Sequence, residues 1–435
     1  MKVAFLTLGC KVNFYETEKM MEQFTKHGFE IADFSEQADI YIINTCTVTN
    51  MADRKSRQMI HKAKKRNPKS LVVAVGCYVE SGGEKLLEDS SIDATFSNKE
   101  KEQIVELVLQ AFQLQIEKKN AEGSASCFDF RQERTRAYLK IQDGCNQFCT
   151  YCLIPYVRGK GILTSVPEDE VIEQIENLAK RDVKEVVLTG IHLSSYGIDR
   201  SSEINFVKLE GKPLLNLIKK AAEIDGIERI RLGSLEPRII TESFVKELSQ
   251  ITKVCPHFHL SLQSGCDTVL KRMNRHYTTD EYKEGVKILR KYFDKPAITT
   301  DVIVGFPGET EEEFKITKKY LEEIKLADIH VFQYSPRSGT KAAAMEEQVT
   351  PQKKKERSEC LIEMTEKHRA EYSNSFVGKR EKVLFEEFVT EDGKKYLSGH
   401  NERYVKIGVS MEEVEKMRYQ ENEIYEITVE KILRK

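Results

Sequence analysis

Three cysteines lie within eight residues of this chain, and no other feature restricts its chemistry so strongly. Cys145, Cys149 and Cys152 have the spacing Cys-x3-Cys-x2-Cys, and no fourth Cys or His is close enough in sequence to complete a zinc site with paired ligands. Three thiolates suit a cubane cluster of four irons and four sulfides, in which one iron stays open to a cofactor or substrate. The alternative is a zinc ion whose fourth ligand comes from elsewhere, such as His192 or Cys255.

Length and composition restrict the class of protein. A chain of 435 residues predicts two or three domains. It has 32% charged residues and no apolar run near the ~20 residues that span a bilayer, so we expect no membrane segment and a cytoplasmic location. Cysteines in that compartment stay reduced, which favours metal ligation or catalysis over disulfides. The net charge of -2 excludes a general polycation.

The first part of the chain alternates short apolar runs with amphipathic stretches, which predicts a parallel sheet with helices on its faces. We expect strands at 3–8, 39–44, 71–75 and 94–96, and helices at 16–27, 52–66, 84–87 and 101–113.

Three further cysteines follow three of these predicted strands. Cys10, Cys46 and Cys77 each come one or two residues after a strand end. The carboxyl ends of strands in a doubly wound sheet meet at one edge, so these thiols can converge and form a second three-thiolate metal site. A single such cysteine would more often be a small buried hydrophobe, but three equivalent positions favour ligation.

Residues 119–133 are small and polar and read as a linker, in which we take Cys127 to be incidental. Beyond it the alternation resumes, with predicted strands at 137–141, 185–188, 229–232, 258–262, 297–304 and 329–334. The predicted helices are 168–179, 214–224, 242–250, 279–291 and 311–324. Six such units predict a partial (β/α)6 barrel, whose chemistry belongs at the carboxyl ends of its strands.

The carboxyl ends of these predicted barrel strands are rich in glycine and polar residues. Glu236 and Gln263 are suited to orient an amine or a hydroxyl there. Each loop is a weak signal, but together with a three-thiolate cluster they predict a cofactor pocket. The loops are the cysteine loop, 189–192, 233–237, 263–265, 305–309 and 335–337.

The last part of the chain predicts a connecting helix at 350–369 and then a small all-β barrel. Its strands are expected at 382–388, 404–408 and 423–432, with turns at 392–393 and 399–401. The predicted architecture is α/β, with an N-terminal domain at 1–118, a barrel domain at 134–365 and a β domain at 370–435.

Two basic runs precede the predicted metal loop in sequence. The run from 54 to 69 is typical of a surface that contacts phosphates, although a charge run is more often a solvated face. We predict RNA contacts from Arg54, Lys62, Lys64, Lys65 and Arg66. The second run consists of Arg131, Arg134, Arg136 and Lys140.

The cysteine motif resembles that of the radical S-adenosylmethionine (SAM) superfamily. Its flanking stretch 134–145 resembles the methylthiotransferase family, and the resemblance covers the whole chain, including a C-terminal TRAM-type RNA-binding barrel. The stretches 7–13, 44–50 and 188–192 are similar to the branch that acts on N6-threonylcarbamoyladenosine in tRNA. Sibling branches act on isopentenyladenosine in tRNA or on an aspartate of a ribosomal protein.

This resemblance implies two 4Fe-4S clusters and SAM as cofactors. The cluster of Cys145, Cys149 and Cys152 would generate the radical that takes hydrogen from C2 of the adenine, and the cluster of Cys10, Cys46 and Cys77 would supply the sulfur. The implied partners are tRNA, an electron donor such as flavodoxin or ferredoxin, and a sulfur donor. No catalytic residue beyond the cluster ligands is implied.

The resemblance also implies cofactor contacts at positions that match the family motifs. The chain departs from those motifs at 161–166, which is one residue longer than usual, with Val166 in place of a common Arg or Tyr. A function of a different class, a zinc-stabilised RNA-binding protein without redox chemistry, stays open. The implied cofactor-binding residues are Tyr151, Arg158, Thr189, Gly190, Ser234, Glu236 and Gln263.

Overall fold

The structure is a computed structural model that describes residues 1–113, 135–198 and 209–434. These residues divide into two compact units. The first unit holds 1–113, 144–162 and 335–343, and the second holds the remaining described residues. The predicted linker, Cys127, Arg131 and Arg134 lie outside the described residues.

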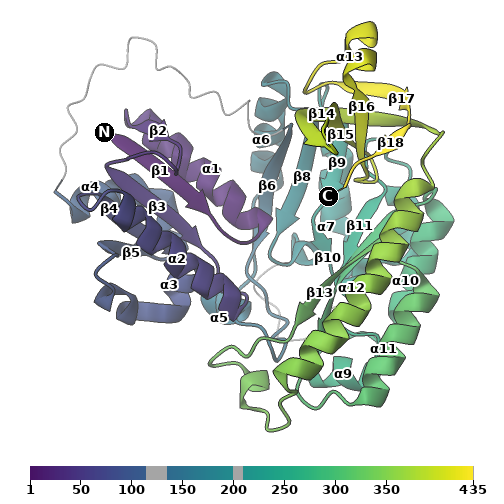
Figure 1. Ribbon diagram of the computed structural model, residues 1–435, viewed down its shortest axis with the longest axis horizontal. Helices are drawn as coiled ribbons and strands as arrows, with labels where there is room; N and C mark the ends of the chain where they lie inside the picture. The colour runs from purple at the N-terminus through teal and green to yellow at the C-terminus, as the bar shows by residue number, and fades with distance from the viewer. Residues whose placement is uncertain (114–134, 199–208, 435) are drawn as a thin grey trace. The chain divides into compact units, whose positions relative to one another are not determined.

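The first unit contains a parallel five-stranded sheet with helices on both faces (Figure 1). The strand order β2-β1-β3-β4-β5 is that of a doubly wound sheet, so this part of the predicted fold class is confirmed. The strands are β1 (Lys2–Thr7), β2 (Glu30–Ala32), β3 (Ile40–Thr45), β4 (Leu71–Gly76) and β5 (Ala94–Phe96). The main helices are α1 (Lys11–Lys26), α2 (Asn50–Arg66), α3 (Cys77–Gly82) and α4 (Ile104–Ala111).

Two apolar clusters hold these layers together. Met20 and Phe24 of α1 pack with α4 residues against Ile40 and Val73 on one face. Ile60 of α2 and its neighbours pack against the other face. The apolar side chains alternate along β1 and β3, which directs each strand's residues to both layers.

The second unit contains a curved set of parallel barrel strands (Figure 1). Together with the short β7, which pairs antiparallel with β6, they form two sheets, ordered β7-β6-β8-β9 and β10-β11-β12-β13. An isolated parallel bridge pairs Ile230 of β9 with Val254, which precedes β11. The strands are β6 (Arg136–Asp143), β7 (Thr164–Ser165), β8 (Glu185–Gly190), β9 (Arg229–Leu232), β10 (Ser234–Leu235), β11 (His257–Leu260), β12 (Ala297–Val304) and β13 (Asp328–Gln333). The helices between them include α6 (Glu168–Lys180), α7 (Lys212–Glu223), α8 (Glu242–Leu248), α9 (Asp267–Arg272), α10 (Thr279–Tyr292) and α11 (Glu311–Ile324).

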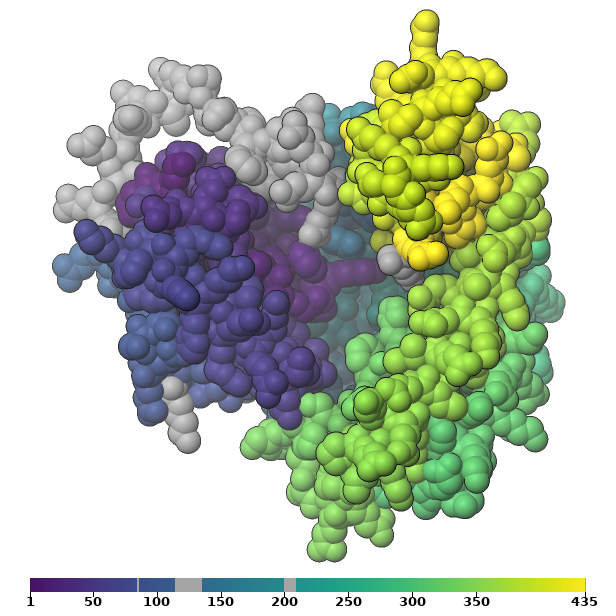
Figure 2. All heavy atoms as spheres, viewed as in Figure 1, coloured from purple at the N-terminus to yellow at the C-terminus, as the bar shows by residue number. Residues whose placement is uncertain are grey.

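After helix α12 (Pro351–Asn374) the chain forms an antiparallel five-stranded sheet of order β17-β14-β15-β16-β18 around one apolar core. Figure 2 shows these C-terminal residues as a yellow group at the end of the green α12. The strands are β14 (Arg380–Glu391), β15 (Lys394–Asn401), β16 (Lys406–Ser410), β17 (Ile424–Thr428) and β18 (Lys431–Ile432), and a short helix α13 (Met411–Met417) joins β16 to β17.

One predicted turn in this C-terminal sheet is wrong. Residues 399–401 lie inside β15, because Gly399 packs on β14 beside an irregularity in the strand register. A Cβ at Gly399 would lie only 2.2 Å from the carbonyl oxygen of Leu384. The glycine therefore permits close strand contact rather than a turn. The predicted turn at Asp392-Gly393 is confirmed, since both residues have positive φ.

A buried charge cluster joins the amino ends of the barrel strands to the C-terminal sheet. Glu185, which has no exposed surface, accepts hydrogen bonds from Arg136 and Arg231 at 3.0 and 2.7 Å. Arg136 also reaches Glu386 of β14 at 2.5 Å, and its guanidinium lies 5.0 Å from the ring centroid of Tyr404.

None of the helices in the described ranges combines the length and apolar character needed to cross a membrane.

Candidate metal centres and cofactor site

Cys10, Cys46 and Cys77 follow three neighbouring strands of the first unit. Cys10 lies between β1 and α1, Cys46 directly follows β3, and Cys77 is the first residue of α3 after β4. Burial raises the pKa of the Cys46 thiol to about 11, and the neighbouring thiols of Cys77 and Cys10 add to this shift. The three thiols therefore converge at the carboxyl edge of the sheet, where the strand order changes direction. This donor set fits an iron–sulfur cluster held by three thiolates.

Two glycines allow the backbone to close around these thiols. Gly9 has φ +102°, and a Cβ there would lie 2.9 Å from the Sγ of Cys46. Gly76 has φ +100°, and a Cβ there would lie 2.7 Å from the carbonyl oxygen of Thr45. Both positions therefore exclude side chains by backbone conformation and by space.

A buried network of charged side chains lies beside Cys77. Arg158 is 2% exposed, and its Nε lies 3.3 Å from the Sγ of Cys77. Its terminal nitrogens donate to Glu16 at 2.8 and 2.9 Å and to Asn13 at 2.8 Å. Lys101 donates to the same Glu16 carboxylate at 2.6 Å. Arg158 and Lys101 thus share one carboxylate, and Arg158 holds its guanidinium beside the Cys77 sulfur.

Sequence reasoning placed Arg158 in the cofactor pocket of the barrel, whereas its contacts here are with the thiol site of the first sheet. It did not find Asn13, Glu16 or Lys101. Asn13 and Glu16 lie three residues apart on α1, shortly after Cys10, so they share a helix face with each other. No comparable sequence feature indicates that Lys101 belongs to the network around Cys77.

The loop with Cys145, Cys149 and Cys152 belongs to the same compact unit as the first three cysteines. The Cys152 backbone N–H donates to the Cys149 carbonyl at 3.0 Å, and Ala342 donates to the Thr150 carbonyl at 2.8 Å. All three cysteines are partly buried, as is Tyr151. This thiol set also fits a cluster with three protein ligands.

Two features fix the shape of this loop. Phe148 has φ +45° and lies against Gly161, where a Cβ would be 2.7 Å from the phenyl ring. The longer segment at 161–166 ends in β7, which pairs antiparallel with β6.

The loop 335–337, predicted to lie at the barrel mouth, is part of segment 335–343, which belongs to the first compact unit. Arg337 is buried and pairs with Asp53 at 2.7 Å. It also donates to the Thr47 hydroxyl at 2.6 Å, next to Cys46 in sequence. Sequence reasoning assigned no such contact to Arg337.

In the second unit, the predicted cofactor residues follow successive barrel strands. Gly190 ends β8, and a Cβ there would lie 2.9 Å from the Gln142 side chain of β6. The backbone N–H of buried Glu236 donates to the Ser194 hydroxyl at 2.9 Å. Gln263 has φ +72°, a strained conformation for a residue other than glycine that occurs often at ligand sites. Thr189 is buried and Ser234 is exposed.

His192 follows the same strand as Thr189 and Gly190. Burial and the charges of Arg275 and Arg238 lower the pKa of His192 to about 3, so the ring is neutral. Its Nδ1 lies 2.5 Å from the Ser195 hydroxyl. The ring is therefore held by its own loop through Nδ1.

The predicted RNA-binding residues lie on or near the exposed side of α2. Arg54, Lys62 and Lys65 are exposed. Lys64 instead pairs with Asp93 at 2.7 Å, and Arg66 donates to the Phe34 carbonyl and lies over the Phe34 ring. Two of the five predicted cations are thus engaged within the domain.

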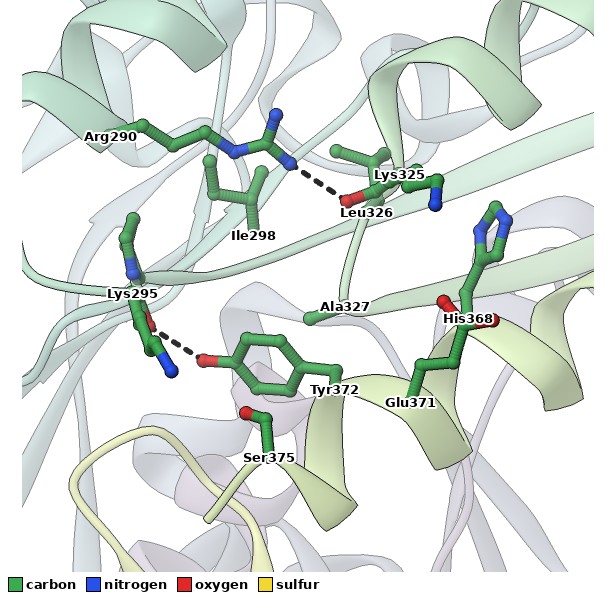
Figure 3. A pocket seen from close by; sticks show the side chains of 11 residues that line it. Arg290, Lys295, Ile298, Lys325, Leu326, Ala327, His368, Glu371, Tyr372 and Ser375 are labelled. Atoms are coloured by element: carbon green, nitrogen blue, oxygen red, sulfur yellow. Dashed lines mark hydrogen bonds between the residues drawn. The ribbon is translucent and has the colours of Figure 1, made fainter.

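A basic cavity of about 490 Å³ lies elsewhere in the second unit. It is lined by Arg290, Lys295, Lys325 and residues of α12, close to the amino ends of β12 and β13. Figure 3 shows Arg290 and the Tyr372 hydroxyl directed at backbone carbonyls of Lys325 and Lys295, at 2.7 and 2.8 Å. The cavity is therefore not the cofactor pocket predicted at the carboxyl ends of the strands.

Two family models match the chain. Residues 2–97 match the Uncharacterized protein family UPF0004, and residues 139–321 match the Radical SAM superfamily. Among solved structures, the radical S-adenosylmethionine methyltransferase TsrM from Kitasatospora setae has a TM-score of 0.55 at 14% identity, over 90% of this chain and 79% of that chain. At this identity the likeness shows the fold alone. The superfamily makes SAM and iron–sulfur clusters the cofactors of this protein.

Curated relatives match almost the whole chain. The threonylcarbamoyladenosine tRNA methylthiotransferase of Bacillus subtilis is 39% identical over 93% of this chain and 89% of that protein. The enzyme of the same name from Aquifex aeolicus is also 39% identical, over 94% and 98%. A tRNA-2-methylthio-N(6)-dimethylallyladenosine synthase from Thermoanaerobacter is 35% identical over 90% and 83%. The chain belongs to the radical SAM tRNA methylthiotransferase family.

Proposed function

We propose that this enzyme attaches a methylthio group to C2 of N6-threonylcarbamoyladenosine, 3′ to the anticodon of tRNA. The observation that supports the reaction is the presence of two three-cysteine sets in one compact unit. The names of the two relatives that are 39% identical support this nucleoside.

Each cysteine set would hold one 4Fe-4S cluster. Cys145, Cys149 and Cys152 would bind the cluster that engages SAM, and Cys10, Cys46 and Cys77 would bind the second. When bound, SAM and the clusters supply the radical that activates C2 and the sulfur and methyl group that are inserted.

The side chains of this protein would bind and orient these groups. Arg158 would hold its guanidinium beside Cys77, with Glu16 fixing its position and Lys101 bound to the same carboxylate. Thr189, Gly190, Ser234, Glu236 and Gln263 would surround SAM at the strand ends, with Tyr151 beside its adenine. Arg158, with its guanidinium 3.3 Å from the Cys77 Sγ, would act on the second cluster rather than on SAM.

The tRNA would contact the exposed cations Arg54, Lys62 and Lys65 of α2. Lys64 and Arg66 would contribute to the positive field from their positions within the domain. The TRAM-type C-terminal sheet would bind a second part of the tRNA. The enzyme would work in the cytoplasm with a small electron-transfer protein such as flavodoxin or ferredoxin and with a sulfur donor. The three domains would be 1–118, 134–365 and 370–435.

The second candidate substrate is isopentenyladenosine in tRNA, which the name of the 35% identical relative favours. Nucleoside mass spectrometry distinguishes the two. In a strain that lacks this protein, we expect loss of 2-methylthio-threonylcarbamoyladenosine and accumulation of its unmodified precursor. The methylthio derivative of isopentenyladenosine should remain unchanged.

Complementation completes this experiment. Wild-type protein should restore the missing nucleoside, whereas Cys145→Ala and Cys77→Ala should not. A Cys360→Ala variant serves as the matched control, because Cys360 lies on α12, outside both cysteine sets. Unchanged methylthio-threonylcarbamoyladenosine in the deletion strain would contradict the proposed substrate.

A further inference from the structure

Three polar side chains meet on adjacent strands in the second unit. His259 of β11 and His330 of β13 lie on either side of Asp301 of β12. The Nε2 of His259 and the Nδ1 of His330 each lie 3.3 Å from a different carboxylate oxygen of Asp301. One ligand atom from each of the three residues lies within 4.8 Å of the other two.

The strand register places these side chains on one face of the sheet. Asp301 pairs directly with His330, and His259 pairs with Thr299, two residues before Asp301. Phe258, Thr300 and Val302 are fully buried and alternate with them, so they face the opposite side. The cluster thus belongs to the more accessible face, where His330 has half of its side chain exposed, at 51%.

His259 is held in position by a further hydrogen bond. Its Nδ1 lies 3.0 Å from the Thr299 hydroxyl, which leaves Nε2 directed at Asp301. Histidines that bind metals commonly make such a bond through their second ring nitrogen. Burial disfavours the charged form of Asp301, but hydrogen bonds from His259 and His330 outweigh it and hold the pKa of Asp301 well below its usual range.

We propose that His259, Asp301 and His330 form a binding site for a divalent first-row metal ion. Two imidazole nitrogens and one carboxylate oxygen suit Zn²⁺, Fe²⁺ or Mn²⁺, and three protein ligands leave coordination positions open to oxygen atoms of a bound molecule. A cubane cluster requires thiolates, so this site would be separate from the two iron–sulfur centres. The inference does not depend on which nucleoside the enzyme modifies.

Mn²⁺ binding to the cluster-loaded, full-length enzyme tests the proposal. Mn²⁺ is a suitable probe because it prefers oxygen and nitrogen ligands to thiolates. Loss of the electron paramagnetic resonance signal of free Mn²⁺ should report one bound ion per chain. Zn²⁺ at equal concentration should displace it, since Zn²⁺ binds such ligand sets more tightly.

Two variants and one control locate the ion. His330→Ala and Thr299→Val should each weaken Mn²⁺ binding at least tenfold, the first by removing a ligand and the second by freeing the His259 ring. His61→Ala is the control, because His61 forms an exposed pair with Asp89 at 2.7 Å on α2. The iron content of every variant should equal that of the wild type.

Two results would overturn the proposal. If the wild-type enzyme binds no Mn²⁺ and no Zn²⁺ outside its iron–sulfur centres, the three residues form only a hydrogen-bonded group. If His330→Ala and Thr299→Val bind Mn²⁺ as tightly as His61→Ala, the ion lies elsewhere. Neither result bears on the nucleoside analysis, so this proposal and the proposed function can fail separately.

Discussion

Gly9 shows how a single residue controls the thiol site of the first sheet. In Gly9→Ala, the new Cβ would lie 2.9 Å from the Cys46 Sγ, in a backbone conformation with φ +102°. Strain of about 1–2 kcal/mol and displacement of the thiol should prevent the second cluster from assembling. We expect the iron content to fall from roughly eight to roughly four per chain, because only the cluster at Cys145 is retained. Iron analysis of anaerobically reconstituted protein measures this.

Gly28→Ala is the matched control for that prediction. Gly28 also has a positive φ, +83°, but an added Cβ would meet nothing within 4 Å. This variant carries the backbone strain without the contact on the thiol, so it should keep both clusters. Full iron content in Gly9→Ala would contradict the steric argument.

The placement of the six cysteines in two sets was predictable at the residue scale, because one set has a short spacing and the other follows strand ends. Their role as cluster ligands stays a prediction. The family to which they point is confirmed by the relatives. The network around Cys77 was not predictable, since Arg158 and Lys101 reach Glu16 across 142 and 85 residues. No local pattern encodes such contacts, and the role of each predicted cofactor residue stays a prediction.

At the scale of elements, α2 is an amphipathic helix with one buried and one basic side. Met59, Ile60 and Ala63 are buried, whereas Arg54, Lys62 and Lys65 are exposed. Replacing these three cations by alanine should weaken tRNA binding and reduce the slope of log affinity against log salt by about 2 to 3, because each lost phosphate contact contributes about 0.7 to 0.9. Filter binding at several salt concentrations measures this slope.

The control for this prediction removes the same charge from the barrel helices. Lys287 of α10 and Lys315 and Lys319 of α11 are exposed. Their triple alanine variant has the same net charge as the α2 variant. If both variants lower the salt slope equally, binding follows net charge and α2 is only a solvated face.

Helices and strands with a regular hydrophobic periodicity were predicted well. Very short elements and elements that contain turn-like residues were not. The predicted boundaries of β9, β12 and α11 agree with the structure at both ends. The sequence analysis missed β2, which has three residues, and β15, where Gly399 and Asn401 resemble turn residues. In β15 the contact between strands outweighs the local preference, and periodicity alone contains no information about that contact.

At the scale of the whole chain, the C-terminal sheet is joined to the barrel by charges that no composition analysis reveals. Arg136 contacts Glu386 across 250 residues. Arg231 donates to the Glu402 carbonyl at 2.9 Å, and Arg229 donates to the His400 carbonyl at 3.0 Å. Sequence patterns identified the α/β and all-β regions correctly, but the pairing of these buried charges depends on the assembled fold.

Glu185→Gln tests whether this charge cluster stabilises the protein. The change leaves Arg136, Arg229 and Arg231 without their shared carboxylate, and breaking a buried ion pair costs about 3–5 kcal/mol. The melting temperature at pH 7 should therefore fall by about 6 °C or more. Glu228→Gln is the control. Glu228 is exposed and directly precedes Arg229, so this change should leave the melting temperature unchanged.

The difference in melting temperature between wild type and Glu185→Gln should depend on pH, because it follows from the charge of Glu185. Burial alone would raise the pKa of Glu185, but Arg231 and Arg136 outweigh it and hold that pKa well below its ordinary value of 4.5. The unfolded chain therefore takes up a proton first as the pH falls, and the stabilisation is complete only above about pH 4.5. Melting temperatures of wild type and Glu185→Gln should converge as the pH is lowered through and below this value. A difference that stays constant down to pH 3 would mean that Glu185 acts through packing rather than through its charge.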